Sequence, residues 1–289
     1  MSDPKHVMVW GNCQAEPLAD LLREPLQRRG LEIVDVPPVF LATPDDVARV
    51  HELVAGSALL VSQPVREEYH VPGCSTQHLA GLLPSDGRLV VFPVLYYSGE
   101  LPYQVTVDDE NGERVNAPRT DYHDLRLLLA AGAGRPVDEV LAGWPVRAPE
   151  AALQAHATAS VAELQRREAS CDVAASDLVS APGSMFTVDH PSNATLVQVA
   201  ARVLAAFDGT SDAEVPPAPE REYLGAIRTP RSGAGSSTAD VDWTIGGESV
   251  PAGEIVTEHL RWYADRPGLV RHGLSRHAKR AADLQLTTG

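Results

Sequence analysis

The residue best suited to chemistry in this sequence is Cys13, in the run Gly11-Asn12-Cys13-Gln14. An apolar segment at residues 6–10 precedes the run and a helical pattern follows it, which predicts a turn between a strand and a helix. Ligands of open α/β sheets bind at the carboxyl ends of the strands, and a helix N-terminus lowers the pKa of a nearby thiol. Cys13 is therefore a candidate nucleophile. The alternative is an inert, buried cysteine in a tight turn.

The neighbours of Cys13 suit a site that holds a reacting carbonyl. Gly11 permits a close approach of the backbone, and Asn12 and Gln14 supply amide donors. Such donors stabilise an oxyanion by about 3 kcal/mol each.

A second candidate is His190, in the segment 186–193 that precedes a predicted helix. A histidine held by the following Pro191 suits a general base or acid. With Cys13 it would form a nucleophile–base pair, although the two are far apart in sequence. The alternative is structural: Ser192 or Asn193 caps the helix while His190 packs nearby.

Further polar residues fall at strand ends or helix starts, hence at the rim of the predicted crevice. Arg66, soon after Gln63, is a candidate partner for a phosphate. Ser75 and Thr76 are candidates for ligand contact, with plain helix capping as the alternative. Tyr96 is a candidate substrate contact, with half-buried packing as the alternative.

The elements that must position these residues alternate between strand and helix. Short apolar runs predict strands at residues 6–10, 32–36, 58–63 and 88–92, and periodic segments between them predict helices at 17–26, 45–54 and 76–83. This alternation predicts an α/β fold with a mostly parallel sheet flanked by helices, layered as in Rossmann or SGNH-type folds.

The second half of the chain is predicted to be helical, over residues 122–131, 149–171, 193–207 and 253–284. Segments 210–219 and 228–237 are predicted as loops, the second of them mobile. We expect an α/β domain at residues 1–207 and a loop-rich, helical extension at 208–289 that packs on it.

Composition narrows the class of protein. With 39 acidic and 24 basic residues the formal net charge is −15, which disfavours binding to nucleic acid or to anionic membranes. The N-terminus does not read as a signal peptide, and no apolar run is long enough for a membrane span. The three widely spaced cysteines match neither a disulfide framework nor a zinc site, so we expect reduced thiols, no metal and a cytoplasmic location.

Taken in order, these segments resemble the WcbI-like family of polysaccharide-biosynthesis acetyltransferases over about residues 5–207. The resemblance rests on the Gly11–Gln14 turn and on further motifs at residues 63–65, 75–76, 92–96, 121–124 and 190–192. It implies a coenzyme A-binding protein with Cys13 and His190 in the active site, lined by Gln14, Gln63 and Thr76. Asp189 and Asn193, on either side of the histidine motif, are predicted substrate contacts.

The leading functional hypothesis is acyl transfer from an acyl-CoA to a hydroxyl or amine of a sugar or a small natural-product acceptor. Cys13 would accept the acyl group and His190 would move the protons; in a variant, His190 activates the acceptor directly and no acyl-cysteine forms. An ester or thioester hydrolase with the same pair, and a non-catalytic module that binds coenzyme A or a nucleotide, are the alternatives. A homodimer is compatible with each of these hypotheses.

Overall fold

The computed structural model of the 289-residue chain describes residues 5–69, 71–211, 214–236 and 242–286. These residues form two compact units that interleave along the chain, whereas the sequence predicts a single division between residues 207 and 208. The sheet unit comprises Met1–Tyr96, Glu163–Ser184 and His190–Leu224, and the helical unit comprises Tyr97–Ala162, Met185–Asp189 and Gly225–Gly289. Helix α6 (Glu150–Glu168) contributes residues to both.

The sheet unit is built on four parallel strands in the order β2–β1–β3–β4. They are β1 (Lys5–Trp10), β2 (Leu31–Val34), β3 (Ser57–Ser62) and β4 (Arg88–Val91). Each lies within two residues of its predicted bounds, and the predicted α/β fold with a parallel sheet is confirmed.

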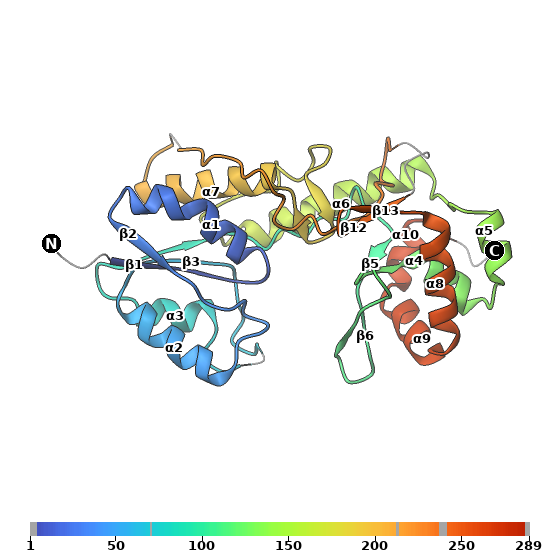
Figure 1. The fold of residues 1–289 in the computed structure, drawn as a ribbon, viewed down its shortest axis with the longest axis horizontal. Coiled ribbons are helices and arrows are strands. Elements are labelled where there is room, and N and C mark those ends of the chain that lie inside the picture. Colours follow the sequence, from blue (N-terminus) through green and yellow to red (C-terminus); the bar gives the residue numbers. More distant parts are fainter. Residues whose placement is uncertain (1–4, 70, 212–213, 237–241, 287–289) are drawn as a thin grey trace. The chain divides into compact units, whose positions relative to one another are not determined.

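Helices cover both faces of this sheet. Figure 1 shows α1 (Ala15–Gln27) and α7 (Asn193–Asp208) on one face, and α2 (Pro44–Ala55) and α3 (Thr76–Leu82) on the other. Apolar side chains of β1 and β3 pack against those of α2 and α3 in one core cluster that includes Met8, Trp10, Val47, Leu60 and Leu79. A parallel sheet covered on both faces explains why its strands read as continuous apolar runs.

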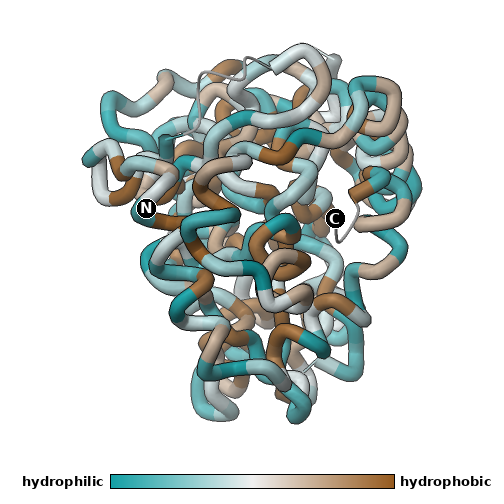
Figure 2. The backbone as a smooth tube through the Cα atoms, turned by 90° about the vertical axis from the view of Figure 1, so that its right-hand side faces the viewer, coloured by the Kyte–Doolittle hydropathy of each residue, from teal (hydrophilic) through white to brown (hydrophobic). Residues whose placement is uncertain are grey.

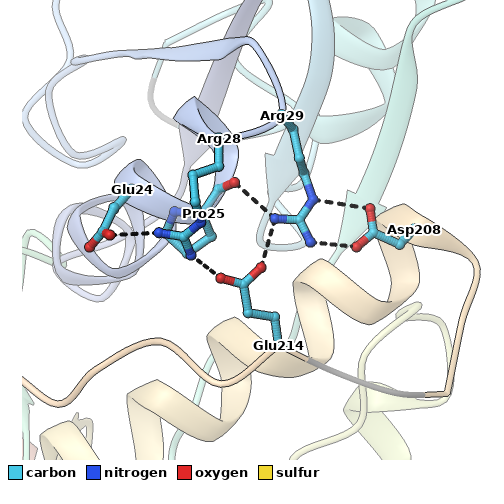
Figure 3. Close-up of polar contacts among 6 residues, drawn as sticks. All are labelled: Glu24, Pro25, Arg28, Arg29, Asp208 and Glu214. Carbon is cyan, nitrogen blue, oxygen red and sulfur yellow. Dashed lines mark hydrogen bonds and ion pairs between the residues drawn. The ribbon is translucent and has the colours of Figure 1, made fainter.

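Helices α1 and α7 pack side by side and run in the same direction. Arg29, just beyond the end of α1, contacts Asp208 at the end of α7 (2.7 Å) and also Glu214 (2.9 Å), while Arg28 contacts Glu214 as well (Figure 3). Because the carboxyl ends of the two helices are joined, their amino-terminal ends lie at the same end of the pair. Since α1 follows β1 directly, that end is the carboxyl edge of the sheet.

The helical unit has its own core. Helices α4 (Leu125–Gly132), α8 (Ala252–Ala264) and α9 (Pro267–Arg276) pack together, joined by α5 (Val137–Ala142) and α10 (Ala278–Asp283). Their buried residues include Leu125, Leu128, Val256, Leu260 and Tyr263. Figure 2, in which the right-hand side of Figure 1 faces the viewer, shows hydrophobic and hydrophilic stretches alternating along the tube, as expected for helices with one buried face.

Short strands complete the helical unit, and the sequence analysis missed them because each is too short to show periodicity. They are β5 (Gln104–Val105) paired with β8 (His123–Asp124), β6 (Val107–Asp108) paired with β7 (Arg114–Val115), and β11 (Ile227–Arg228), β12 (Trp243–Ile245) and β13 (Glu248–Val250) in one sheet. Strand β9 (Met185–Thr187) contacts β11.

Two predictions for the second half were wrong in detail. The single helical stretch at 253–284 is divided into α8, α9 and α10, and Pro267 starts α9 because proline suits a first helical turn but not an interior one. The loop at 228–237, predicted as mobile, is fixed by its backbone over the described residues. Thr229 N donates to Phe186 O (2.9 Å), Gly233 N donates to Glu100 O (3.0 Å), and Gly235 N donates to Glu150 Oε1 (2.7 Å).

A buried histidine in the helical unit is held in its neutral form. His123 Nε2 lies 2.8 Å from the carbonyl of Val115, which can only accept, so Nε2 carries the proton and Nδ1 accepts from the Tyr263 hydroxyl at 2.7 Å. Burial lowers the pKa of His123 to about 4, with smaller contributions from nearby His259 and Arg114.

We therefore predict that acid destabilises this protein before its carboxylates titrate. An unfolded histidine has a pKa near 6.5. Between about pH 6.5 and 4, His123 is therefore protonated in the unfolded state and neutral in the folded state. The free energy of unfolding should fall as pH falls through this window. Urea unfolding of the wild type and of His123→Gln at several pH values measures it, and an equal pH slope in the two proteins would contradict the assignment to His123.

Candidate functional site

The turn that carries Cys13 begins where β1 ends, and a glycine is required there. A Cβ atom on Gly11 would lie 2.5 Å from Gln63 Oε1 and 2.8 Å from its Cδ, closer than side chains tolerate. The carbonyl of Gly11 accepts a hydrogen bond from Val39 N (2.8 Å), so the loop after β2 is joined to the same turn.

Asn12 shapes the entry into α1. Its Oδ1 accepts from Gln14 N (3.0 Å) and its carbonyl accepts from Ala15 N (2.9 Å), while its own amide donates to Gln63 Oε1 (2.8 Å). The Gln14 side chain does not cap α1 but turns into the core. Cys13 is half-buried, is in no disulfide and lies directly before the N-cap of α1, where the partial positive charge of the helix favours a thiolate.

Two buried glutamines connect the ends of three strands. Gln14 Nε2 donates to Leu95 O (2.8 Å), and Gln14 Oε1 accepts from Leu95 N (3.0 Å) and from Gln63 Nε2 (3.0 Å). Both glutamine side chains are almost fully buried. Gln14 follows β1, Gln63 follows β3 and Leu95 follows β4, so these bonds fix the carboxyl edge of the sheet around Cys13. Gln14 and Gln63 thus act on the site by positioning its backbone.

Thr76 and Ser75 hold the loop that follows β3. Thr76 Oγ1 donates to Gln63 O (2.6 Å) and accepts from Val65 N (2.8 Å). Ser75 is the N-cap of α3, where its hydroxyl accepts from His78 N (3.1 Å). Both residues therefore have structural contacts, and a role in ligand binding stays a prediction.

His190 belongs to the sheet unit together with Cys13. It is half-buried in β10 (His190–Pro191), and Ser192 follows as the N-cap of α7, with its amide bonded to Ser184 O (2.8 Å). The parallel packing of α1 and α7 brings both helix starts, and the segments of Cys13 and His190 that precede them, to the same edge of the sheet.

The two residues predicted to flank His190 on the substrate side have other contacts. Asn193 is buried at the first position of α7, where its amide group binds Arg221 O (2.8 Å) and Tyr223 N (3.1 Å). Asp189 belongs to the helical unit, where its Oδ1 accepts from Tyr122 Oη and from Thr187 Oγ1 (3.1 Å). Asn193 fixes the segment at 221–223, and its role as a substrate contact stays a prediction.

Arg66 and Tyr96 differ in exposure. Arg66 is exposed shortly after β3, whereas Tyr96 is half-buried and its carbonyl accepts from Arg167 Nη2 (3.0 Å). Arg167 Nη1 also donates to Val94 O (3.2 Å), so this arginine of α6 braces the segment after β4 that Gln14 holds from the other side. Arg167 was not among the predicted site residues, and the motif at 92–96 contains Leu95 without indicating its bonds to Gln14. Nothing in the local sequence marks an arginine or a backbone amide for contacts 70 or more positions away.

The three cysteines differ in their surroundings. Cys74 is fully buried and burial raises its pKa; Trp10 Nε1 donates to its carbonyl at 2.9 Å. Burial, with the nearby Glu168 and Asp172 carboxylates, raises the pKa of Cys171 to about 11. Cys13 and Cys74 each directly precede the N-cap of a helix at the sheet edge, but Cys13 is half-buried whereas Cys74 is fully buried.

We predict that Cys13 is alkylated faster than Cys74 and Cys171 at pH 7. The reason is that the thiolate reacts, and the other two thiols are protonated or shielded. Time-resolved labelling with iodoacetamide and peptide mapping measures the three rates. Labelling of Cys171 or Cys74 at the rate of Cys13 would remove the case for an activated thiol.

We also predict that Gln63→Ala destabilises the fold by about 1–3 kcal/mol, because it leaves the Asn12 amide and Gln14 Oε1 short of a partner. Urea unfolding measures the loss. Gln27→Ala is the matched control, since Gln27 is exposed near the end of α1. Equal effects of the two substitutions would show that the glutamine network adds nothing to stability.

Two general features bear on the class of site. In the described part of the chain no helix is long and apolar enough to cross a membrane. The same residues contain no group of three or more histidine, cysteine, aspartate or glutamate side chains arranged to hold a metal ion.

Comparison with known proteins agrees with the resemblance drawn from the motifs. The family model described as polysaccharide biosynthesis enzyme WcbI matches residues 6–211. A solved structure of WcbI, called a novel polysaccharide biosynthesis enzyme, superposes with a TM-score of 0.80 at 19% identity, over 97% of this chain and 98% of that chain. It is described as the native protein without a disulfide bond between coenzyme A and a cysteine, and at this identity the likeness shows the fold alone. Comparison with curated proteins gave no significant match. Because the family model covers most of the chain, this protein belongs to the WcbI family of polysaccharide biosynthesis enzymes.

Proposed function

We propose that this protein transfers an acyl group from an acyl-CoA to a hydroxyl or amine of a sugar or small-molecule acceptor. The observation that carries the proposal is the half-buried Cys13 thiol at the start of α1, fixed at the carboxyl edge of the sheet by buried amides. The description of the similar structure, which mentions coenzyme A and a cysteine, supports the choice of donor.

The residues around Cys13 fit a thioester of an anionic carrier. The positive end of the α1 dipole favours anions at this edge, and Arg66 is exposed shortly after β3. Both features suit the phosphates of coenzyme A without requiring a basic surface on an acidic protein.

In the first step His190 takes the proton of Cys13, and the thiolate attacks the thioester carbonyl. A bond forms between Cys13 Sγ and the acyl carbon, the bond to the sulfur of coenzyme A breaks, and His190 returns the proton to the departing thiolate. One thioester replaces another, so the step is close to balanced in energy.

In the second step His190 takes the proton of the acceptor hydroxyl or amine, which attacks the acyl carbon on Cys13. The bond to Sγ breaks and the thiolate regains a proton from His190. A second route has no acyl-cysteine: His190 activates the acceptor for direct attack on the thioester, and Cys13 shapes the pocket.

The oxyanion donor can be narrowed to one side chain among those predicted. The Gln14 side chain is committed to Leu95 and Gln63, and the backbone amides of Asn12 and Gln14 donate to Gln63 Oε1 and Asn12 Oδ1. Within the described residues, Asn12 Nδ2 donates no comparable hydrogen bond, and the Asn12 side chain is half-exposed. We assign the oxyanion contact to Asn12 Nδ2.

A hydrolase with the same pair, and a module that binds coenzyme A without turnover, are distinguished from this proposal by product. A transferase yields an acylated acceptor, a hydrolase yields free acid without an acceptor, and a binding module yields neither. Mass spectrometry of the protein and of the products after incubation with acetyl-CoA separates all three.

We predict that coenzyme A raises the melting temperature, because a ligand that binds only the folded state stabilises it by mass action. A concentration of 100 times the Kd corresponds to about 2.7 kcal/mol. Cys13→Ala should keep the shift if binding is non-covalent. No shift in the wild type at millimolar coenzyme A would contradict the proposed donor.

We predict that Cys13 and His190 act as a unit. Cys13→Ala and His190→Ala should each remove most of the transfer rate, and the double variant should be little worse than either, because each step needs both groups. His190→Ala should also raise the pH at which Cys13 is alkylated, since a neighbouring imidazolium favours thiolate.

Cys171→Ala is the control for loss of a cysteine away from the helix start. Single-variant losses that multiply in the double variant would show that Cys13 and His190 work independently, and His190 would then be a structural residue.

A further inference from the structure

Two loops at the carboxyl edge of the sheet expose large apolar side chains. In the described part of the chain five large apolar side chains are exposed, and three of them, Phe40, Leu41 and Tyr69, lie in these loops. Phe40 and Leu41 follow β2, and Tyr69 follows β3. A single exposed apolar residue is ordinary, but a concentration of them at one edge marks a surface that binds an apolar group.

The loop after β2 is free of charge. Residues 36–43 contain no charged residue, in a chain with 39 acidic and 24 basic residues. Val39 and Ala42 are buried in the core cluster beneath the loop, whereas Phe40 and Leu41 between them are 45% and 63% exposed. The fold is therefore packed through Val39 and Ala42, and it leaves much of Phe40 and Leu41 in solvent.

The backbone of this loop is fixed on both sides of the exposed residues. Leu41 N donates to Pro38 O (2.9 Å), which closes a turn. Thr43 caps α2: its hydroxyl accepts from Asp46 N (3.2 Å) and its amide donates to Asp46 Oδ2 (2.9 Å). A preformed apolar surface loses less conformational entropy when a ligand covers it than a flexible one does.

The same loop is joined to the turn that carries Cys13. Val39 N donates to Gly11 O at 2.8 Å. Phe40 follows Val39 directly and Cys13 lies two residues after Gly11, so one hydrogen bond and three peptide units connect Phe40 to Cys13. A hydrocarbon chain that begins at Cys13 Sγ therefore starts close to this loop.

The loop after β3 lies on the same core as the loop after β2. Val65 and Val71, on either side of Tyr69 in the sequence, pack in the cluster that also holds Val39 and Ala42. Since both loops cover one cluster, Tyr69 adds to the apolar surface that the loop after β2 provides. We refer to Phe40, Leu41 and Tyr69 as the apolar rim.

We propose that the apolar rim binds the hydrocarbon chain of the acyl group, so that the donor is a medium-chain acyl-CoA such as octanoyl-CoA rather than acetyl-CoA. This inference rests on the proposed acyl transfer and specifies its acyl group. An acetyl group ends one methyl beyond the thioester carbonyl and gains nothing from apolar side chains outside the turn. A longer chain removes both its own surface and that of the rim from water.

Calorimetric titration of the wild type with acetyl-CoA and with octanoyl-CoA tests the chain preference. A fully buried methylene strengthens binding about 4-fold. Even partial burial of the longer chain should therefore make octanoyl-CoA bind at least about 10-fold more tightly than acetyl-CoA.

Variants of the rim assign the preference to its side chains. Phe40→Ser combined with Leu41→Ser should weaken binding of octanoyl-CoA at least about 10-fold, and Leu41→Met alone should retain tight binding because it conserves apolar volume. Val215→Ser is the matched control, since Val215 is 57% exposed in the same unit but lies in the segment after α7. It should bind octanoyl-CoA as the wild type does.

The outcomes separate this inference from the proposed function. Equal binding of the two thioesters, or a preference for octanoyl-CoA that survives the double variant, would overturn the inference and leave acyl transfer in place. Failure of the wild type to bind either thioester would overturn the proposed function and the inference with it. Sedimentation velocity tests another occupant: a dimer that dissociates in the double variant while octanoyl-CoA still binds tightly would assign the rim to a second copy of the chain.

Discussion

Two buried glutamine amides hold the carboxyl ends of three strands together in this fold. Gln14 and Gln63 bond to each other, to the backbone of Leu95 after β4 and to the amide of Asn12 after β1. A buried amide that lost these partners would cost about 1–3 kcal/mol, so the turn around Cys13 cannot shift without breaking several bonds at once. The requirement for glycine at position 11 has the same origin, because the Gln63 side chain fills the space of a Cβ.

Helices α1 and α7, which pack side by side on one face of the sheet, align two segments that are far apart in the sequence. Asp208 and Glu214 bind Arg29 at the far end of α1 and α7, while Ser192 and Asn193 fix the near end of α7 through backbone and side-chain bonds. This alignment places His190, which is far from Cys13 in the sequence, at the same carboxyl edge of the sheet. The catalytic pair that we propose therefore depends on how two helices are aligned rather than on the local sequence of either.

Elements that depend on local patterns, such as strands and helix starts, could be predicted from the sequence, whereas hydrogen bonds between distant segments could not. Strands β1 to β4 were found because a parallel sheet buried on both faces leaves unbroken apolar runs, and the start of α7 because Ser192 is a recognisable cap. Cys13 was recognised by its place between strand and helix. Gln14 and Gln63 were predicted as lining residues. Gln14 lies 49 positions from Gln63 and 81 positions from Leu95, so no local pattern indicated that both glutamine side chains bond to the backbone. Nor did composition predict that the 228–237 loop is fixed, since its bonds are to Phe186, Glu100 and Glu150.

Arginine supplies many of the long-range connections, and its geometry explains why lysine could not. Lys5 and Lys279 are the only lysines. Arg29 bonds to Pro25 O and to Asp208, and Arg167 bonds to two carbonyls of the segment after β4. A planar fork of five donors allows such paired bonds, whereas a single ammonium does not hold them in fixed directions. These arginines therefore stabilise the fold through their internal bonds. Arg147 connects segments in the same way, because it bonds to Gly233 O (3.0 Å) and to Glu150 (3.2 Å). In a chain this acidic, internal carboxylates compete with carbonyl oxygens for each arginine, and the planar fork lets one arginine such as Arg29 bind both kinds of acceptor.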